Sequence, residues 1–249
     1  MESHECSTVK AIMFDLDNTL IDTAGVGVLA LEKVTELLQS RLGAENNAAD
    51  ICRKFSVKLL KEEFDPSKTT IDDLRISHWE EAIQEVKGTG ASRSLAEECY
   101  LMWKFTRLQH LAIAEPARNM LVELRKVYKL LLLTNGDTQT QREKVNAVGA
   151  EAWFDAVVIG GDYKEQKPAA SIFLTCCEIL DVKPSCCVMV GDSFDTDIQG
   201  GINAGFKATI WLCTSDKKFK EELISPPYLI NSVLDVPKIL NIINKKQSN

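Results

Sequence analysis

The chain has 249 residues, of which 45% are hydrophobic and 26% are charged. This composition is typical of a globular protein with one or two hydrophobic cores. The formal net charge of −7 makes nonspecific binding to nucleic acid or to an anionic membrane unfavourable, because such binding depends on clustered Lys and Arg. The sequence shows no secretory signal pattern and no apolar run of about 20 residues. We therefore expect a cytoplasmic protein without a membrane segment, and no pattern indicates an obligate protein partner.

The eight cysteines raise the question of disulfide bonds or a zinc site. Four of them form the adjacent pairs Cys176–Cys177 and Cys186–Cys187, and adjacent side chains point apart on a helix or a strand. No Cys-x-x-Cys motif occurs. In a reducing compartment such cysteines remain thiols. We expect buried, reduced thiols and no structural zinc.

The first predicted element is a buried strand over Val9–Phe14, where apolar and β-branched residues follow one another. From about residue 24 to residue 110, apolar residues recur with the spacing of helices and no stretch predicts a strand. After residue 110, buried strands alternate with helical patterns. The later strands are predicted over 129–133, 155–159, 186–190, 207–211 and 228–230, with a loop over 214–227 and a final helix over 233–243.

This order of elements predicts an α/β fold with a doubly wound parallel sheet. The helical stretch stands between the first strand and the others, so we expect an inserted, all-helical cap domain. The predicted core domain comprises residues 1–22 and 111–249, and the predicted cap comprises residues 23–110. Because the chain leaves the sheet at the carboxyl end of the first strand, the cap is expected above the edge where open α/β sheets bind ligands.

Two carboxylates follow the first predicted strand. Asp15 and Asp17 would point to opposite faces of a regular strand, so the chain must turn there for both to reach one ligand. An isolated Asp-x-Asp pair also occurs in solvated turns and calcium loops. The calcium interpretation is weakened by Leu20, because the sixth position of such a loop requires glycine.

Groups that can bind an anion follow the next strands. Thr134 and Asn135 come directly after the strand over 129–133, and Lys167 precedes Pro168 and a predicted helix. A hydroxyl, an amide and an ammonium group can all donate hydrogen bonds to a phosphate. Taken singly, the first pair also fits an ordinary turn and the lysine fits a solvated surface position.

Two further carboxylates, Asp192 and Asp197, follow Gly191 at the end of the strand over 186–190. The glycine lets the backbone turn, and Asp192 is expected at the same sheet edge as Asp15. The alternative is that these carboxylates only stabilise the amino terminus of a helix. Four motifs in order at four strand ends favour a shared site.

The motif order is Asp-x-Asp-x-Thr, Thr-Asn, Lys-Pro and Gly-Asp-x-x-x-x-Asp, and it resembles the haloacid dehalogenase superfamily across the whole predicted core. The resemblance implies a Rossmann-like core with a cap inserted after the first motif. It also implies a Mg²⁺-dependent phosphatase in which Asp15 is the nucleophile and Asp17 is the general acid and base. Mg²⁺ would be held by Asp15, Asp192 and the main-chain carbonyl of Asp17.

The remaining motif residues would bind or orient groups at this site. Asp197 is expected to orient Lys167 or a water molecule bound to the metal. The phosphoryl group would be surrounded by the main-chain amides of Leu16 and Asp17 and by the side chains of Thr134, Asn135 and Lys167.

Three alternatives stand beside a phosphatase. A metal-free dehalogenase has no leaving alcohol to protonate, so Asp17 disfavours it. A phosphomutase uses the same four motifs, and the core sequence alone does not separate it from a phosphatase of another small sugar phosphate. A binding protein with an inactive core would be expected to lack the nucleophile or a metal ligand, and both are present.

Segments outside the motifs, at 21–24, 77–85, 106–110 and 139–144, resemble the branch of this family that hydrolyses the 9-phosphate of sialic acids. Such a substrate carries a carboxylate far from its phosphate, and a buried carboxylate favours an arginine partner. Arg75 and His78, three residues apart on a predicted cap helix, are the candidates. The alternative is that both are solvated cap residues.

Overall fold

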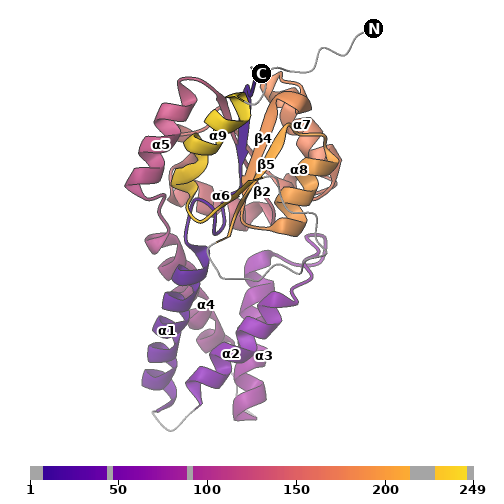
Figure 1. Cartoon of the computed structure of the whole chain (residues 1–249). Helices are drawn as coiled ribbons and strands as arrows, with labels where there is room; N and C mark the ends of the chain where they lie inside the picture. Colours follow the sequence, from indigo (N-terminus) through magenta and orange to yellow (C-terminus); the bar gives the residue numbers. More distant parts are fainter. Residues whose placement is uncertain (1–7, 44–46, 89–91, 214–227, 246–249) are drawn as a thin grey trace, which may run out of the picture. The chain divides into compact units, whose positions relative to one another are not determined.

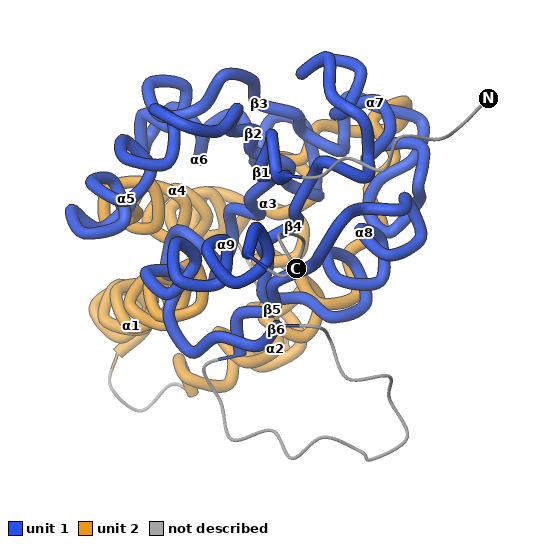
Figure 2. The backbone as a smooth tube through the Cα atoms, turned by 45° about the horizontal axis from the view of Figure 1, so that its top comes forward, with its two compact units in different colours: residues 1–22, 112–249 blue, residues 23–111 orange. Residues whose placement is uncertain are grey.

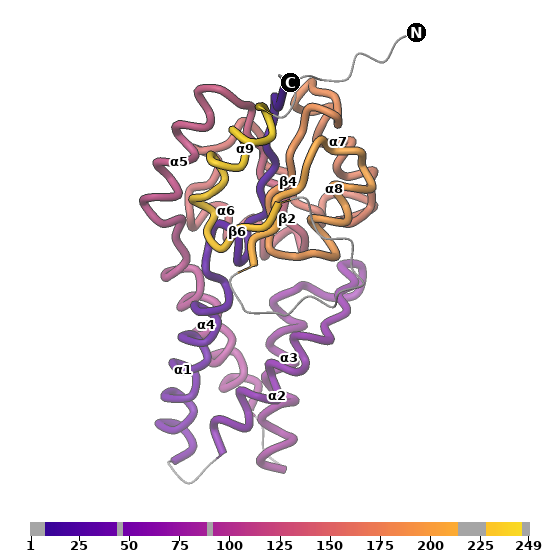
Figure 3. The backbone as a smooth tube through the Cα atoms, viewed as in Figure 1, coloured from indigo at the N-terminus to yellow at the C-terminus, as the bar shows by residue number. Residues whose placement is uncertain are grey.

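The computed structural model describes residues 8–43, 47–88, 92–213 and 228–245, so the loop predicted over 214–227 lies outside the described residues. The chain forms two compact units (Figure 2). Unit 1 comprises residues 1–22 and 112–249, and unit 2 comprises residues 23–111. The chain leaves unit 1 after β1 and returns to it before α5, as the path in Figure 3 shows.

Unit 1 is built on one parallel sheet, as the alternation of strands and helices predicted. In the described part of the chain the sheet has six strands in the order β3-β2-β1-β4-β5-β6. The central strand β1 pairs in parallel with β2 on one side and with β4 on the other, so the carboxyl ends of these two strands lie beside its own. The strands are β1 (Ala11–Phe14), β2 (Lys129–Thr134), β3 (Ala156–Ile159), β4 (Cys187–Gly191), β5 (Ala208–Leu212) and β6 (Tyr228–Ile230).

Helices cover both faces of this sheet, which confirms the doubly wound α/β class (Figure 1). Helices α7 and α8 lie on one face and α5 and α9 on the other (Figure 2). Met13 and Leu131 belong to the same buried cluster as Phe173 of α7, so alternate strand residues fill this side. The helices of unit 1 are α5 (Glu115–Arg125), α6 (Thr138–Ala147), α7 (Ala170–Leu180), α8 (Gln199–Asn203) and α9 (Val236–Lys245).

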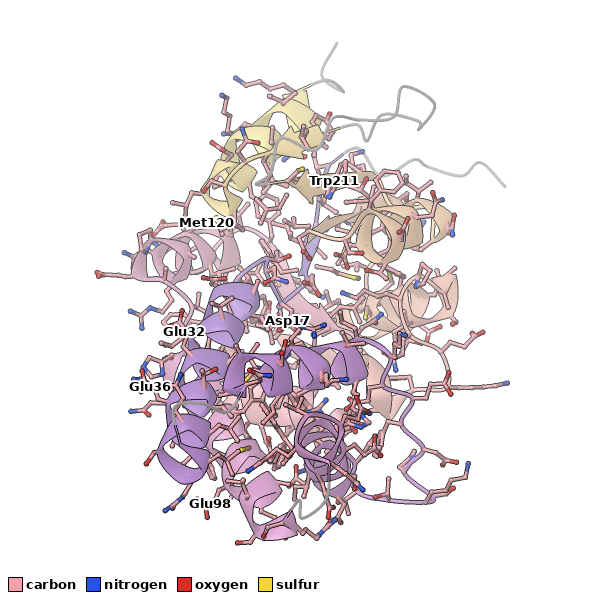
Figure 4. All side chains as sticks on the ribbon, turned by 90° about the horizontal axis from the view of Figure 1, so that it is seen from below. Asp17, Glu32, Glu36, Glu98, Met120 and Trp211 are labelled. Carbon is pink, nitrogen blue, oxygen red and sulfur yellow. The ribbon has the colours of Figure 1, made fainter. Side chains whose placement is uncertain are left out.

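Unit 2 is helical and has its own hydrophobic core. Its helices are α1 (Thr23–Leu42), α2 (Ala48–Leu60), α3 (Ile71–Lys87) and α4 (Arg93–His110). At the centre, Phe55 stacks on Trp79 with ring centroids 3.8 Å apart, and Trp103 meets Phe55 edge-on. Glu32 and Glu36 on α1 are exposed and point outward (Figure 4). This helix is therefore amphipathic, with Val34 and Leu38 buried on its inner face.

The cysteines depart in one respect from the expectation of reduced thiols. Six of them are free thiols, and five of these six are buried. Cys186 forms a disulfide bond, so the prediction is wrong at that position. Among the described residues, no helix is both long enough and apolar enough to cross a lipid bilayer.

Candidate active site

A tight turn at the end of β1 brings Asp15 and Asp17 out of strand alternation. The amide of Asp15 still donates to the carbonyl of Val190 on β4, at 2.9 Å. Asn18 then adopts a left-handed conformation with φ 56°, and its amide donates to the carbonyl of Ile21 at 2.8 Å. The short polar side chain of asparagine tolerates this conformation better than most residues. The turn that the two carboxylates require is present.

Lys167 is buried at the centre of the strand ends. Its Nζ lies 2.7 Å from Oδ1 of Asp15 and 2.7 Å from Oδ1 of Asp197, and it donates to the carbonyl of Leu133 at 2.8 Å. Burial alone would lower the pKa of Lys167, but Asp15 and Asp197 together raise it above its usual value. Lys167 is therefore a fixed positive charge and not a proton donor at neutral pH.

Asn135 positions the main chain of Lys167. Its Nδ2 donates to the Lys167 carbonyl at 2.8 Å, and its Oδ1 accepts from the Lys167 amide at 3.0 Å. The peptide bond between Lys167 and Pro168 is cis. The asparagine that we expected to face an anion thus makes two contacts that hold the lysine loop against the end of β2.

The hydroxyl of Thr134 is a buried polar group at the end of β2, unsatisfied within the described part of the chain. Thr134 is 1% exposed, and its Oγ1 has no hydrogen-bond partner among the described residues. A buried hydroxyl without a partner costs free energy, so a ligand oxygen in this place would stabilise the site. This feature fits a bound phosphate at the end of β2.

Three carboxylates form an acidic cluster. One oxygen each from Asp15, Asp192 and Asp197 lies within 4.8 Å of the others. Burial, only partly offset by Lys167, raises the pKa of Asp15 to about 6, and burial also raises the pKa of Asp192 and of Asp197. Three acidic groups facing one lysine leave excess negative charge. A hard divalent cation such as Mg²⁺, which prefers carboxylate oxygens, is compatible with this donor set.

The loop after β4 holds the last two of these carboxylates. The indole of Trp211 on β5 donates to the main-chain carbonyl of Asp192 at 2.8 Å. Residues Phe194–Ile198 form a single π-helical turn, and the amide of Ser193 donates to Oδ2 of Asp197 at 3.1 Å. Asp197 is 1% exposed and its other oxygen contacts Lys167. It contacts the lysine and also belongs to the acidic cluster, whereas the sequence interpretation gave it only an orienting role.

Two residues of α6 contact Asp17 and were not singled out as functional from the sequence. Lys144 Nζ lies 2.8 and 2.9 Å from the two carboxylate oxygens of Asp17, and Gln141 Nε2 donates to Oδ2 at 3.0 Å. Both α6 residues are buried. One sequence feature could have indicated them. They are three residues apart on a helix that begins shortly after Thr134-Asn135-Gly136.

Arg75 and His78 lie in unit 2, where their partner is Glu62. The guanidinium of Arg75 makes hydrogen bonds of 2.9 to 3.3 Å to both Glu62 oxygens, and its Cζ lies 5.8 Å from the ring centroid of Trp103. His78 Nε2 is 3.6 Å from Glu62, and burial lowers the pKa of His78. The arginine fork that we expected to receive a substrate carboxylate is occupied by a carboxylate of the protein.

Residues 9–205 match the haloacid dehalogenase-like hydrolase family, and the chain belongs to this family. The matched range includes residues of both units. It is 55% identical to the N-acylneuraminate-9-phosphatase of Homo sapiens over 97% of this chain and 98% of that protein. Among solved structures, the HAD-hydrolase YfnB of Bacillus subtilis superimposes with a TM-score of 0.68 and 23% identity, over 94% of this chain and 99% of that one. A 2-haloacid dehalogenase from Pseudomonas syringae gives a TM-score of 0.66 and 26% identity, over 94% of this chain and 99% of that one.

The packing of Asp197 against Gly191 gives a testable prediction. A Cβ at position 191 would lie 2.1 Å from Oδ2 of Asp197, so the carboxylate would have to move. We expect Gly191→Ala to lower the free energy of unfolding by about 1–3 kcal/mol, the usual range for overpacking. Urea denaturation measures this value.

The matched control is Gly27→Ala in α1, where a Cβ would meet nothing within 4 Å. Since alanine is the better helix former, this variant should be as stable as the parent chain or up to about 1 kcal/mol more stable. A Gly191→Ala variant as stable as Gly27→Ala would contradict the tight packing.

Proposed function

We propose that this protein is a phosphomonoesterase that converts N-acylneuraminate 9-phosphate to free N-acylneuraminate and phosphate. The observation that carries the phosphatase assignment is the division of partners between Asp15 and Asp17. Asp15 contacts Lys167, and Asp17 contacts Lys144 and Gln141. Two nearby carboxylates in different environments suit two different roles, one as nucleophile and one as acid and base.

The proposed identity of the sugar rests on the proteins to which this chain is most similar in sequence among those compared above. Identity of 55% over nearly the full length of the human N-acylneuraminate-9-phosphatase covers both units, so it includes the helical unit as well as the motif residues. Within this family the core binds only the phosphoryl group that all its phosphate esters share. Resemblance across the inserted unit therefore supports the same leaving group.

The acidic cluster is the proposed Mg²⁺ site. Asp15 and Asp192, with the main-chain carbonyl of Asp17, would hold the ion, and Asp197 completes the acidic surroundings. When bound, the ion neutralises charge on the phosphoryl oxygens, which otherwise repel an anionic nucleophile. The charge balance of the site supports this proposal, because among the described residues three carboxylates gather around the buried Lys167.

The first step transfers the phosphoryl group to the protein. A carboxylate oxygen of Asp15 attacks phosphorus while the bond from phosphorus to the sugar oxygen breaks, and Asp17 gives its proton to that oxygen. Lys167 holds Asp15 and supplies positive charge beside it. The hydroxyl of Thr134 and the main-chain amides of Leu16 and Asp17 would donate to the phosphoryl oxygens.

The second step releases phosphate. Asp17, now ionised, takes a proton from water as the water oxygen attacks phosphorus, and the bond between phosphorus and Asp15 breaks. The two steps use the same carboxylate in opposite directions, so its position relative to the phosphoryl group decides both rates.

Asp15→Asn should abolish turnover and leave the fold intact. The substitution removes the nucleophile without changing side-chain volume, and Lys167 keeps Asp197 as a partner. The measurements are phosphate release, acid-quenched capture of a phosphorylated protein, and circular dichroism. Near-normal turnover, or an acid-stable phosphoenzyme in the variant, would show that another group attacks phosphorus.

The raised pKa of Asp15 makes the stability of the metal-free protein depend on pH. The folded pKa of about 6 exceeds the unfolded value of 3.8, so between these values the folded chain holds more protons than the unfolded chain. The stability due to this group is complete below about pH 4 and falls as pH rises through about 6. Mg²⁺ binds the ionised form, so it should raise the melting temperature more at about pH 7 than at about pH 5.

Asp192→Asn is the companion variant, and it should reduce the Mg²⁺-induced shift at the higher pH. Differential scanning fluorimetry with EDTA or Mg²⁺ measures both quantities. A shift of equal size at the two pH values, unchanged in Asp192→Asn, would place the ion elsewhere.

The substrate assignment is tested with a panel of sugar phosphates. We expect kcat/KM for N-acylneuraminate 9-phosphate to exceed that for hexose 6-phosphates by about 10²-fold or more, because a site built for a polar group rejects analogues that lack it. Phosphate release should not require a bisphosphate activator. Equal rates across the panel would leave a general sugar phosphatase, and dependence on a bisphosphate with isomerised product would indicate a phosphomutase.

A further inference from the structure

Helix α6 carries two buried polar residues that converge on Asp17. Gln141 is 5% exposed and Lys144 is 6% exposed. They are three residues apart, so both project from one face of the helix. A lysine is seldom buried unless its charge is paired. Here the paired group is the carboxylate of Asp17, at 2.8 and 2.9 Å from the lysine nitrogen.

Gln141 ties this contact to the end of β2. Its Nε2 donates to Oδ2 of Asp17 and also to the main-chain carbonyl of Asn135, so both hydrogens of the amide are used. A Cβ on Gly136 would lie 2.9 Å from the same nitrogen, and Gly136 has φ 122°, a conformation that glycine adopts readily. The strand end, the glycine and the helix therefore leave Gln141 little freedom.

The amino terminus of α6 is fixed as well. Oδ1 of Asp137 accepts from the amide of Thr140 at 2.8 Å and caps the helix. The helix thus begins at a set distance from Thr134 and Asn135, and its second turn carries Gln141 and Lys144 to Asp17. The carboxylate is held by two side chains from one rigid element.

We propose that Lys144 and Gln141 are positioning residues that hold the carboxylate of Asp17 for proton removal from the water that cleaves the aspartyl-phosphate. This inference rests on the proposed phosphatase function. A cation at the acidic cluster would attract the side chain of Asp17. Lys144 gives it a separate cationic partner, while Lys167 keeps Asp15. In this step the water oxygen bonds to phosphorus, its proton passes to Asp17, and the bond from phosphorus to Asp15 breaks.

The test separates the two chemical steps with p-nitrophenyl phosphate, whose leaving group departs without a proton. Lys144→Met should still release about one equivalent of p-nitrophenol rapidly, because phosphorylation of Asp15 does not need Asp17 with this substrate. Steady-state turnover should then fall by about 10²-fold, the lower end of the usual contribution of general base catalysis, and phosphoenzyme should accumulate. Rapid-quench kinetics and acid capture of the phosphorylated chain measure both effects.

Arg142→Met on the same helix is the matched control. Arg142 is half-exposed and pairs with Asp162 and Glu151, not with Asp17. This variant should keep the turnover and phosphoenzyme level of the parent chain. Gln141→Met removes the amide and keeps a similar volume. It should accumulate phosphoenzyme in the same direction as Lys144→Met, and it serves as the test if the lysine variant does not fold.

Two outcomes would overturn the inference. Folded Lys144→Met or Gln141→Met with turnover and phosphoenzyme within about twofold of the parent chain would show that Asp17 needs no positioning, since general base catalysis is worth far more. Equal loss of the burst and of turnover, without phosphoenzyme, would show a merely structural contact. Failure of the proposed function is distinct, because then the parent chain itself would form no phosphoenzyme on Asp15.

Discussion

The ion pairs of Lys167 are the constraint on which the site depends. A buried ammonium loses several kcal/mol of hydration, so it requires partners that are held in place. These partners come from three strand ends: Asp15 after β1, the carbonyl of Leu133 on β2, and Asp197 after β4. Asn135, at the same edge of the sheet, makes two hydrogen bonds to the main chain of Lys167. If any of these elements moved, a buried charge would lose a partner, and removing one partner of a buried pair is strongly destabilising. The sheet order and the site are therefore stabilised together.

A second lysine makes the two carboxylates of the first motif chemically different. One residue separates them, and the turn at Asn18 places their side chains beside different lysines. Asp15 faces Lys167 in a buried setting that raises its pKa to about 6, whereas the side chain of Asp17 is 25% exposed and is held by Lys144. Because each carboxylate of the motif has its own lysine, their negative charges are balanced separately. In the proposed mechanism, this separation lets Asp15 attack phosphorus while Asp17 moves a proton.

Features of the fold could be predicted from the sequence where the interactions behind them are local or topological. The strands, the helical insertion and the strand-end motifs were predictable, because apolar runs and the rule that ligands bind at the carboxyl edge of a parallel sheet are local or topological. Lys144 was not predicted, since its partner stands 127 positions away and a lysine on a helix is usually solvated. Nor was Glu62 predicted as the partner of Arg75, 13 residues distant across a turn. The disulfide of Cys186 also ran against the expectation for a chain without a signal pattern. Long-range charge pairing leaves no periodic trace in a single sequence.

The charged groups described for the site come from one of the two units. The ion pairs described for Asp15, Asp17, Lys144, Lys167 and Asp197 are all made within unit 1. Unit 2 has a separate aromatic core around Phe55 and Trp79, and the partly buried Arg75 is paired there with Glu62. In the proposed mechanism these ion pairs supply the charges around phosphorus, so a substitution on a helix of unit 2 would leave the described pairs intact. Under the proposed function, the leaving group could therefore change while the phosphoryl chemistry of unit 1 stays the same.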